Sequence, residues 1–388
     1  LTIGEQSTPK GEIYDIQFKG SGRTPYSRGG DGRAALGPML REYLISEAMF
    51  YLNIPTTRSL AVVETGEKVL RETPLKGAIL TRVAASHVRF GTFQFLAAHK
   101  DIDAMSKLLD YCIKRHFPEI LDSPNKVIKF IELVMSKQID LIVNWMRVGF
   151  IHGVMNTDNS TICGETIDYG PCAFMDQYNH KAVFSSIDFQ GRYSYGNQPA
   201  TIHWNLIRLA ESLLPLIDKD EKKSVEIAQK TIDSFSEIFN EKWQIMMRSK
   251  LGLTDQSEED EVLIKDLLTW MQSKKPDFTN TFCNLMYGNH AKDEDFEDND
   301  FVIWKKNWKE RVNNNDYLNI MKKTNPILIP RNYLVEEALA EAEIEGKFSK
   351  FNELLVVLSK PYEQLDIDEK YSKTPQIQAE PYKTFCGT

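Results

Sequence analysis

Residues 149–176, which read GFIHGVMNTDNSTICGETIDYGPCAFMD, decide the fold of this chain. An apolar stripe over residues 127–148 predicts a long helix that leads into this stretch and delivers His152 to a loop. A polar turn follows at residues 156–159, and two short strand-like pieces then flank a glycine turn at residues 163–165. This order predicts a long helix, a polar loop and a β-hairpin in direct succession.

The two ends of the expected hairpin carry oxygen donors. Asn159 precedes its first strand and Asp168 follows its second, so strand pairing is expected to bring the two side chains together. An amide oxygen and a carboxylate suit Mg²⁺ when substrate phosphates complete its coordination shell. Either residue alone is also a common turn residue. Taken with their surroundings, they predict a metal site at Asn159 and Asp168.

The same layout occurs in kinases, where a catalytic loop with a metal-binding Asn precedes a second metal-binding Asp. Small-molecule kinases commonly place the catalytic Asp two residues after the His and the metal Asn seven residues after it. Here the seventh residue after His152 is Asn159, but the second is Val154. The nearest carboxylate that could replace the missing base is Asp158. The sequence therefore predicts a kinase-like site whose transfer chemistry has been altered.

The N-terminal part supplies matching elements. Residues 13–19 (IYDIQFK) alternate in polarity and predict a half-buried strand, with Tyr14, Ile16 and Phe18 on one face and Asp15, Gln17 and Lys19 on the other. Lys19 ends this strand, as the phosphate-binding Lys of a kinase does. Glu42 lies off the apolar stripe of a helix that Pro38 opens, and it can pair with Lys19. Arg82 and Arg89 flank a strand exit, where Arg suits bidentate phosphate contacts.

The remaining pattern divides the chain into three parts. β-Strands are expected at residues 59–64, 68–71 and 77–84, with a turn at residues 65–67. Helices are expected at residues 92–98, 102–116, 127–148, 204–217 and 222–250. We expect an α+β, protein-kinase-like fold with two lobes and an extension. The small β-rich lobe with one helix spans residues 1–90, the larger helical lobe with the catalytic and metal-binding loops spans 91–250, and the helical C-terminal extension spans 251–388.

Composition excludes several classes of function. The 388 residues carry 47 Lys and Arg against 55 Asp and Glu, a net charge of −8, so nucleic-acid binding is not expected. No apolar run is long enough for a transmembrane helix, and no membrane partner is expected. The five cysteines are odd in number and contain no CxxC, which favours a reducing, cytoplasmic compartment. The chain begins with Leu, and we expect a fragment or processed form that lacks its original N-terminus.

Several long motifs carry a resemblance to a known family. They are FKGSGRTPYSRGGDGRAALGPMLREYLISEAM, IPTTRSLAVV, GAILTRVAASHVRFGTFQF, the stretch of residues 149–176, GRYSYGNQP and NPILIPRNYLVEEAL, with a Cys near the C-terminus. Together they closely resemble the selenoprotein O family (SelO, the bacterial YdiU group). The resemblance implies a pseudokinase fold that binds ATP in a flipped orientation. It also implies transfer of AMP to Ser, Thr or Tyr hydroxyls of protein substrates, and transfer of UMP with manganese is attributed to family members.

The resemblance also implies roles for individual residues. The nucleotide-binding residues it implies are Lys19, Asp31, Gly32, Arg82, Arg89 and Asp168. It implies Asp158 as the proton acceptor, Asn159 and Asp168 as ligands of Mg²⁺ or Mn²⁺, Glu42 as the helix partner of Lys19, and Cys386 as a redox element. Family members carry a further glycine-rich loop ahead of the point where this chain starts. We therefore expect an incomplete nucleotide pocket.

Two other functions stay open at this point. One is a true phosphotransferase. Val154 at the usual position of the base and the GGDGR loop argue against this function. The other is a nucleotide-binding pseudokinase scaffold without catalysis, against which the pair Asn159 and Asp168 speaks. The motifs are most similar to the bacterial branch of the family, so we expect a bacterial cytoplasmic enzyme.

Overall fold

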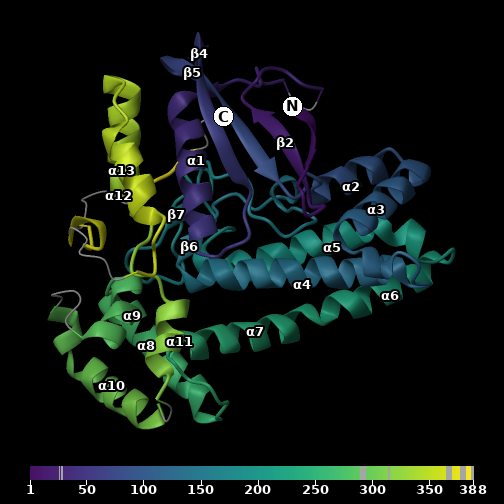
Figure 1. Ribbon diagram of the computed structural model, residues 1–388. Coiled ribbons are helices and arrows are strands. Elements are labelled where there is room, and N and C mark those ends of the chain that lie inside the picture. The colour runs from purple at the N-terminus through teal and green to yellow at the C-terminus, as the bar shows by residue number, and fades with distance from the viewer. Residues whose placement is uncertain are drawn as a thin grey trace.

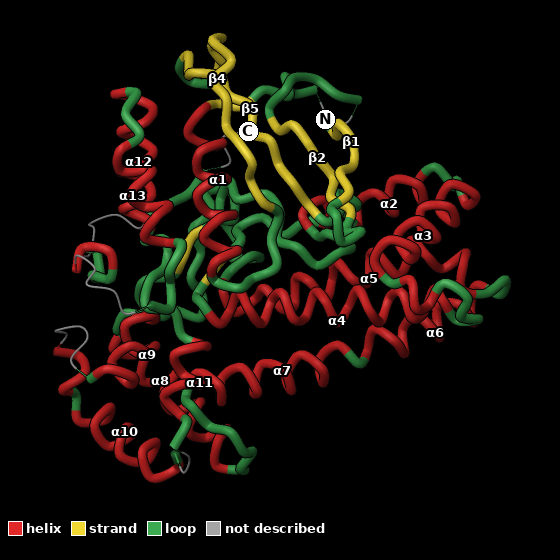
Figure 2. Tube along the Cα trace, viewed as in Figure 1, coloured by secondary structure: helices red, strands yellow, loops and turns green. Residues whose placement is uncertain are grey.

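The computed structural model is a mixed α/β structure with its sheet near the N-terminus (Figures 1 and 2). It describes residues 1–25, 27, 29–288, 294–312, 315–363, 369–375 and 382–385. The strands are β1 (Thr2–Ser7), β2 (Ile13–Lys19), β3 (Ala34–Ala35), β4 (Arg58–Leu70), β5 (Pro74–Ala84), β6 (Phe150–Ile151) and β7 (Ala173–Phe174). The first helices are α1 (Leu36–Tyr51), α2 (Phe90–Ala98), α3 (Ile102–His116), α4 (Lys126–Arg147), α5 (Gln198–Ile217), α6 (Glu221–Asp233) and α7 (Phe235–Lys250). The later helices are α8 (Glu259–Lys274), α9 (Phe278–Tyr287), α10 (Asn299–Arg311), α11 (Tyr317–Thr324), α12 (Asn332–Ala340) and α13 (Ser349–Leu358).

The N-terminal sheet is organised around β5, which pairs antiparallel with β2, β3 and β4. Strand β1 extends the sheet from β2. Helix α1 packs against β4 and β5 and buries Leu40, Leu44 and Ala48. The register aligns Gln17 with Arg82, and it thereby sets Lys19 and Arg82 near the same end of the sheet.

Strand β4 differs from the prediction. The turn expected at residues 65–67 lies inside one continuous strand, and the chain reverses only after Leu70. Between the pairs Glu64 with Ala78 and Lys68 with Lys76, β4 has more residues than β5. A bulge absorbs the surplus, and Gly66 takes a φ of +76° there. A glycine that signals a turn in the sequence therefore marks a bulge.

Strand β2 was predicted with Asp15 on its polar face, yet Asp15 is buried. Its carboxylate pairs with Arg115 at 2.7 Å and accepts the backbone N–H of His87 at 2.8 Å. Arg115 lies at the end of α3, so the ion pair connects the sheet to the first helices of the larger part. A buried carboxylate is tolerated because it is paired and hydrogen-bonded.

Two helices after the sheet differ from the prediction. Helix α5 begins at Gln198, ahead of the predicted start at residue 204, with Pro199 in its first turn. Helix α3 has the predicted bounds, and α4 lies beside α5, with α7 packed against α4 (Figure 1). The helix expected over residues 222–250 is divided at Ser234 into α6 and α7. The Ser234 hydroxyl donates to the carbonyl of Thr231 at 2.8 Å, a local bond that competes with the helical pattern.

The C-terminal helices form two groups (Figure 1). Helices α8 to α11 lie beyond α7, whereas α12 and α13 return to stand beside α1. Tyr43 of α1 faces Phe351 of α13 with ring centroids 6.1 Å apart, and the backbone N–H of Gly37 donates to Glu343 at 2.9 Å. The extension thus covers one side of α1.

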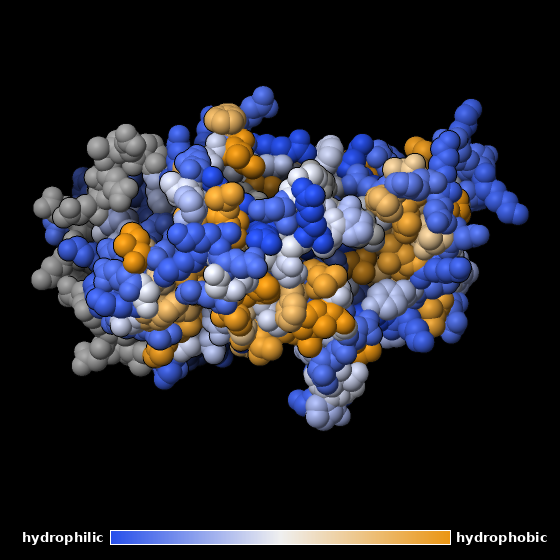
Figure 3. All heavy atoms as spheres, turned by 90° about the horizontal axis from the view of Figure 1, so that it is seen from above, coloured by the Kyte–Doolittle hydropathy of each residue, from blue (hydrophilic) through white to orange (hydrophobic). Residues whose placement is uncertain are grey.

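The surface is predominantly hydrophilic in the view from above, with separate apolar areas between the polar side chains (Figure 3). Within the described ranges, no helix combines the length and the apolar character that crossing a bilayer requires.

Candidate functional site

Four charged side chains meet between the sheet, α1 and the segment after β6. Lys19 Nζ lies 2.7 Å from Glu42 Oε2 and forms a second ion pair with Asp168 Oδ1. Arg82 Nε donates to Glu42 Oε1 at 2.8 Å, and a terminal nitrogen of Arg82 lies 3.7 Å from Asp168 Oδ1. Glu42 was expected only to lie off the apolar stripe of its helix, yet it is 1% exposed. Arg82 is 2% exposed. The structure therefore brings Lys19, Glu42, Arg82 and Asp168 into one cluster.

Mutual attraction keeps this cluster ionised. Burial opposes the charge on Glu42, but Arg82 and Lys19 outweigh it and lower the pKa of Glu42. Burial likewise opposes the charge on Asp168, and Lys19 and Arg82 lower its pKa well below the usual range. For Lys19, the attraction of Asp168 and Glu42 exceeds the effect of burial and raises its pKa. At neutral pH two cations face two anions.

His152 holds the backbone ahead of Asp168. Its ring is fully buried, and Nε2 donates to the carbonyl of Ile167 at 2.8 Å, while Nδ1 accepts the N–H of Val154 at 3.4 Å. Burial lowers the pKa of His152, which favours this neutral form. Asp168 itself has a φ of +71°, a left-handed conformation that an Asp adopts at a cost. The histidine thus fixes the peptide that leads into a strained aspartate.

The hairpin expected between Asn159 and Asp168 is not formed. A tight turn replaces it, in which the Thr161 hydroxyl donates to the carbonyl of Glu165 at 2.7 Å. The two arms pair with other segments instead, Thr161 with Arg89 and Thr166 with Thr56. The two strand-like pieces are too short to satisfy the hydrogen bonds of each other's backbone groups. Neighbouring backbone segments provide those hydrogen bonds instead.

The loop with Asp158 and Asn159 forms a short 3₁₀ turn, Thr157–Asn159, beside the start of α2. The backbone N–H of Phe90 donates to the carbonyl of Ser160 at 2.9 Å, and the Asp158 carboxylate lies against Gly91. The charges of Asp168 and Asp158 both act on Arg89, which precedes α2. Arg89 therefore lies within electrostatic reach of both carboxylates.

Asn159 and Asp168 each carry an oxygen of the kind that a hard cation binds. Asn159 Nδ2 donates to the carbonyl of Val154 at 2.9 Å, which leaves the amide oxygen for a ligand. Asp168 is ionised, and its two cationic neighbours both contact Oδ1. Within the described residues, no three His, Cys, Asp or Glu side chains gather into a metal site of their own. The donor set therefore suits an ion that also takes oxygens from a bound nucleotide.

Asp31 and Gly32 lie in a separate cavity of about 590 Å³ that Lys19 also lines. The Asp31 carboxylate is held by both terminal nitrogens of Arg71, at 3.0 and 3.3 Å. Arg71 also donates to the carbonyl of Arg33 at 2.7 Å. Arg71 is not among the predicted site residues, because an Arg in the turn after a strand carries no signal of its own. The glycine-rich loop is thus fastened to the turn between β4 and β5.

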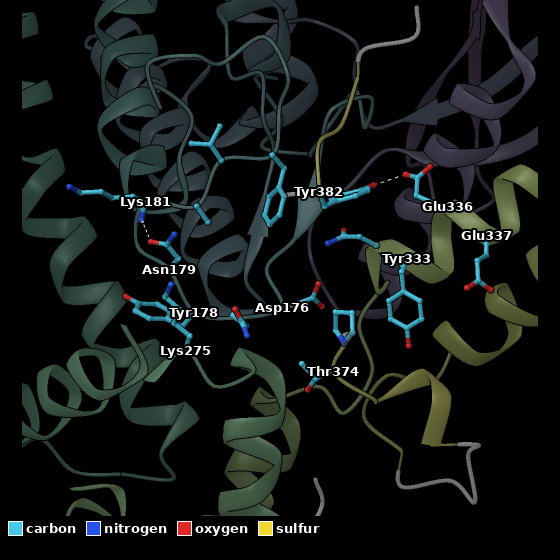
Figure 4. A pocket seen from close by; sticks show the side chains of 16 residues that line it. Asp176, Tyr178, Asn179, Lys181, Lys275, Tyr333, Glu336, Glu337, Thr374 and Tyr382 are labelled. Carbon is cyan, nitrogen blue, oxygen red and sulfur yellow. Dashed lines mark hydrogen bonds between the residues drawn. The ribbon is translucent and has the colours of Figure 1, made fainter. Parts of the chain in front are cut away.

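A second missed residue, Arg41, precedes Glu42 on α1 and is 6% exposed. Its guanidinium contacts Glu336 at 2.7 Å, the carbonyl of Cys172 at 2.8 Å and the Tyr382 hydroxyl at 3.1 Å. Figure 4 shows Tyr382 directed at Glu336 on one side of a cavity of about 820 Å³. Arg41 therefore connects α1 with the segment behind Asp168, with α12 and with residues near the C-terminus.

The expected redox residue Cys386 lies outside the described residues. Just before it, Thr384 is buried against the segment that follows Asp168. Its hydroxyl donates to the carbonyl of Pro171 at 2.6 Å, and its backbone exchanges hydrogen bonds with Phe184 and Ser186. Each cysteine in the described part of the chain is buried and free of disulfides, namely Cys112, Cys163, Cys172 and Cys283.

Known proteins are similar in sequence to nearly the whole of this chain. Residues 1–359 match the family described as Protein adenylyltransferase SelO. The protein nucleotidyltransferase YdiU of Bacillus cereus is 54% identical over 393 residues, which cover 100% of this chain and 80% of the relative. Those of Clostridium beijerinckii and Anoxybacillus flavithermus are also 54% identical, over 100% of this chain and 80% and 81% of the relatives. The chain therefore belongs to the SelO family of protein adenylyltransferases, as its motifs predicted, and is a nucleotidyltransferase that uses ATP.

Proposed function

We propose that this site transfers AMP from ATP to Ser, Thr and Tyr hydroxyls of protein substrates. The observation that carries the proposal is the gathering of three cations around Asp168. Lys19 and Arg82 share the carboxylates of Glu42 and Asp168, and Arg89 adds a third cation. Burial and the charge of Arg82 lower the pKa of Arg89, and its Nε has no hydrogen-bond partner among the described residues. The phosphate oxygens of ATP are suitable partners for these cations.

Each charged residue then has a role in the transfer. Lys19, Arg82 and Arg89 bind phosphate oxygens, and Glu42 orients the first two through its two carboxylate oxygens. Asp158 accepts the proton of the substrate hydroxyl as the new bond between that oxygen and the α-phosphorus forms. The bond from the α-phosphorus to the bridging oxygen breaks, and pyrophosphate leaves. Asn159 and Asp168 would hold Mg²⁺ or Mn²⁺, which neutralises charge on the phosphates when bound. Asp31 and Gly32 contact the nucleotide from the glycine-rich loop.

We also propose that the fold is protein-kinase-like, with lobes at residues 1–90 and 91–250 and an extension at 251–388. The pairing of Lys19 on a strand with Glu42 on the one helix of the sheet supports this assignment. The long helices α4 and α5 beneath the sheet fit the larger lobe. The extension is closely integrated, because α12 and α13 pack on α1.

The position of the transferred label tests the proposal. Incubation with ATP labelled at the α-phosphate should label protein, including the enzyme itself, whereas ATP labelled at the γ-phosphate should not. Asp158→Asn and Asp168→Asn keep the side-chain volume and should lower transfer by about 10²-fold or more without unfolding the chain. A parallel reaction with α-labelled UTP and Mn²⁺ tests UMP transfer. Stoichiometric γ-labelling would establish a kinase, and ATP binding without either label would establish a scaffold.

A further inference from the structure

The start of α2 holds the loop with Asp158 by backbone contacts on both sides. The N–H of Phe90 donates to the carbonyl of Ser160 at 2.9 Å, and the N–H of Ile162 donates to the carbonyl of Val88 at 3.0 Å. The Thr157 hydroxyl also donates to Gln94 Oε1 at 2.5 Å. The loop therefore cannot move away from α2 without breaking several hydrogen bonds.

Gly91 lies in the first turn of α2, at the point where Asp158 meets the helix. A Cβ at residue 91 would collide with Asp158 Oδ1 and would lie 3.2 Å from Cγ and 3.7 Å from Cα of Asp158. The carboxylate thus occupies the space that any side chain at this position would take.

Neither the backbone nor the helix calls for glycine here. Gly91 is not one of the glycines with a positive φ, so a residue with a side chain could adopt its backbone conformation. Glycine within a helix is about 1 kcal/mol less favourable than alanine. The close approach of the Asp158 carboxylate is therefore the feature that requires a residue without a side chain.

We propose that Gly91 is a positioning residue for AMP transfer, which keeps open the place in which the Asp158 carboxylate is held. This inference rests on the proposed role of Asp158 and deepens it. A methyl group at residue 91 meets the end of a side chain with two rotatable bonds rather than a backbone atom. The carboxylate turns away to make room, and the fold stays intact. The substitution therefore lowers the rate of transfer because Asp158, the proposed proton acceptor, is no longer correctly oriented.

Gly91→Ala tests this directly, with Gly4→Ala as the matched control because a Cβ at Gly4 meets nothing within 4 Å. A displacement of about 1 Å can cost about 10²-fold in rate, so we expect kcat for α-label transfer to fall by about 10- to 10²-fold. The KM for ATP and the calorimetric affinity for ATP should stay unchanged. The urea midpoint should stay equal or rise. Gly4→Ala should match the unmodified protein in activity.

A double variant separates this inference from the proposed function. If Gly91 acts through Asp158, adding Gly91→Ala to Asp158→Asn should lower the residual transfer no further. Full activity of Gly91→Ala beside an inactive Asp158→Asn would refute the role of Gly91 and leave the proposed function standing. Full activity of Asp158→Asn would refute the proposed function itself. A lower urea midpoint for Gly91→Ala would show that the helix, not the carboxylate, had moved, and would also overturn the inference.

Discussion

Glu165 makes the stability of this protein depend on pH in a direction opposite to most carboxylates. It lies in the turn after the loop with Asp158, and its Oε2 accepts the backbone N–H of Ala85 at 2.9 Å. Burial raises the pKa of Glu165 from 4.5 to about 7. Between these two values the folded chain retains a proton that the unfolded chain has lost. Stability therefore falls as the pH rises through this range.

Glu165→Gln removes the titration while keeping the oxygen that accepts from Ala85. One pKa unit corresponds to about 1.4 kcal/mol, so the full difference between 4.5 and about 7 amounts to at most about 3–4 kcal/mol. The variant should match the unmodified protein near pH 5, to within about 1 kcal/mol, and should be more stable by about 2–3 kcal/mol above pH 7.

Urea unfolding of both proteins between about pH 5 and pH 8 measures this difference, because every other titrating group contributes equally to the two curves. Glu64→Gln, at an exposed position of β4, is the matched control and should leave the pH dependence unchanged. Parallel curves for Glu165→Gln and the unmodified protein would refute the reasoning, since Glu165 would then titrate alike in both states.

Two further predictions concern the arginines around the site. Arg89→Met should weaken ATP binding by about 10-fold, since it removes one charge-assisted phosphate contact, and calorimetric titration with ATP measures this loss. Arg41→Met should lower the free energy of unfolding by about 1–3 kcal/mol and reduce transfer, because the Cys172 carbonyl loses its donor. Arg41→Met with full stability and full activity would show that α1 is held in place without it.

Local periodicity predicted much of the fold. The bounds of α3 follow from its apolar spacing, and β2 and α1 follow from alternation and from the proline at residue 38. Periodicity could not show that Asp15 and Glu42 are buried, because their partners Arg115 and Arg82 lie on other elements. Charged residues on the polar side of a pattern are read as exposed unless their partners are known.

For the candidate site too, the sequence predicted the residues with a local pattern and missed those whose contacts lie far away in the chain. Motif spacing led to Asp158, Asn159 and Asp168, because that spacing lies within one short stretch. The contact of Arg41 with Glu336 spans 295 positions in the sequence, and no local pattern carries it. Gly91 did leave a signal, since an isolated glycine at the start of a helical pattern indicates a packing requirement. The predicted helix begins one residue later, at Thr92, so Gly91 was assigned to the preceding loop.

The contact between Thr384 and Pro171 bears on the order in which the ribosome makes this protein. The two residues are 213 positions apart, and every charged residue of the site precedes Pro171. The charged cluster is therefore synthesised long before the segment that closes against it. The finished arrangement, in which Thr384 hydrogen-bonds to Pro171, Phe184 and Ser186, can form only after residue 384 has been added.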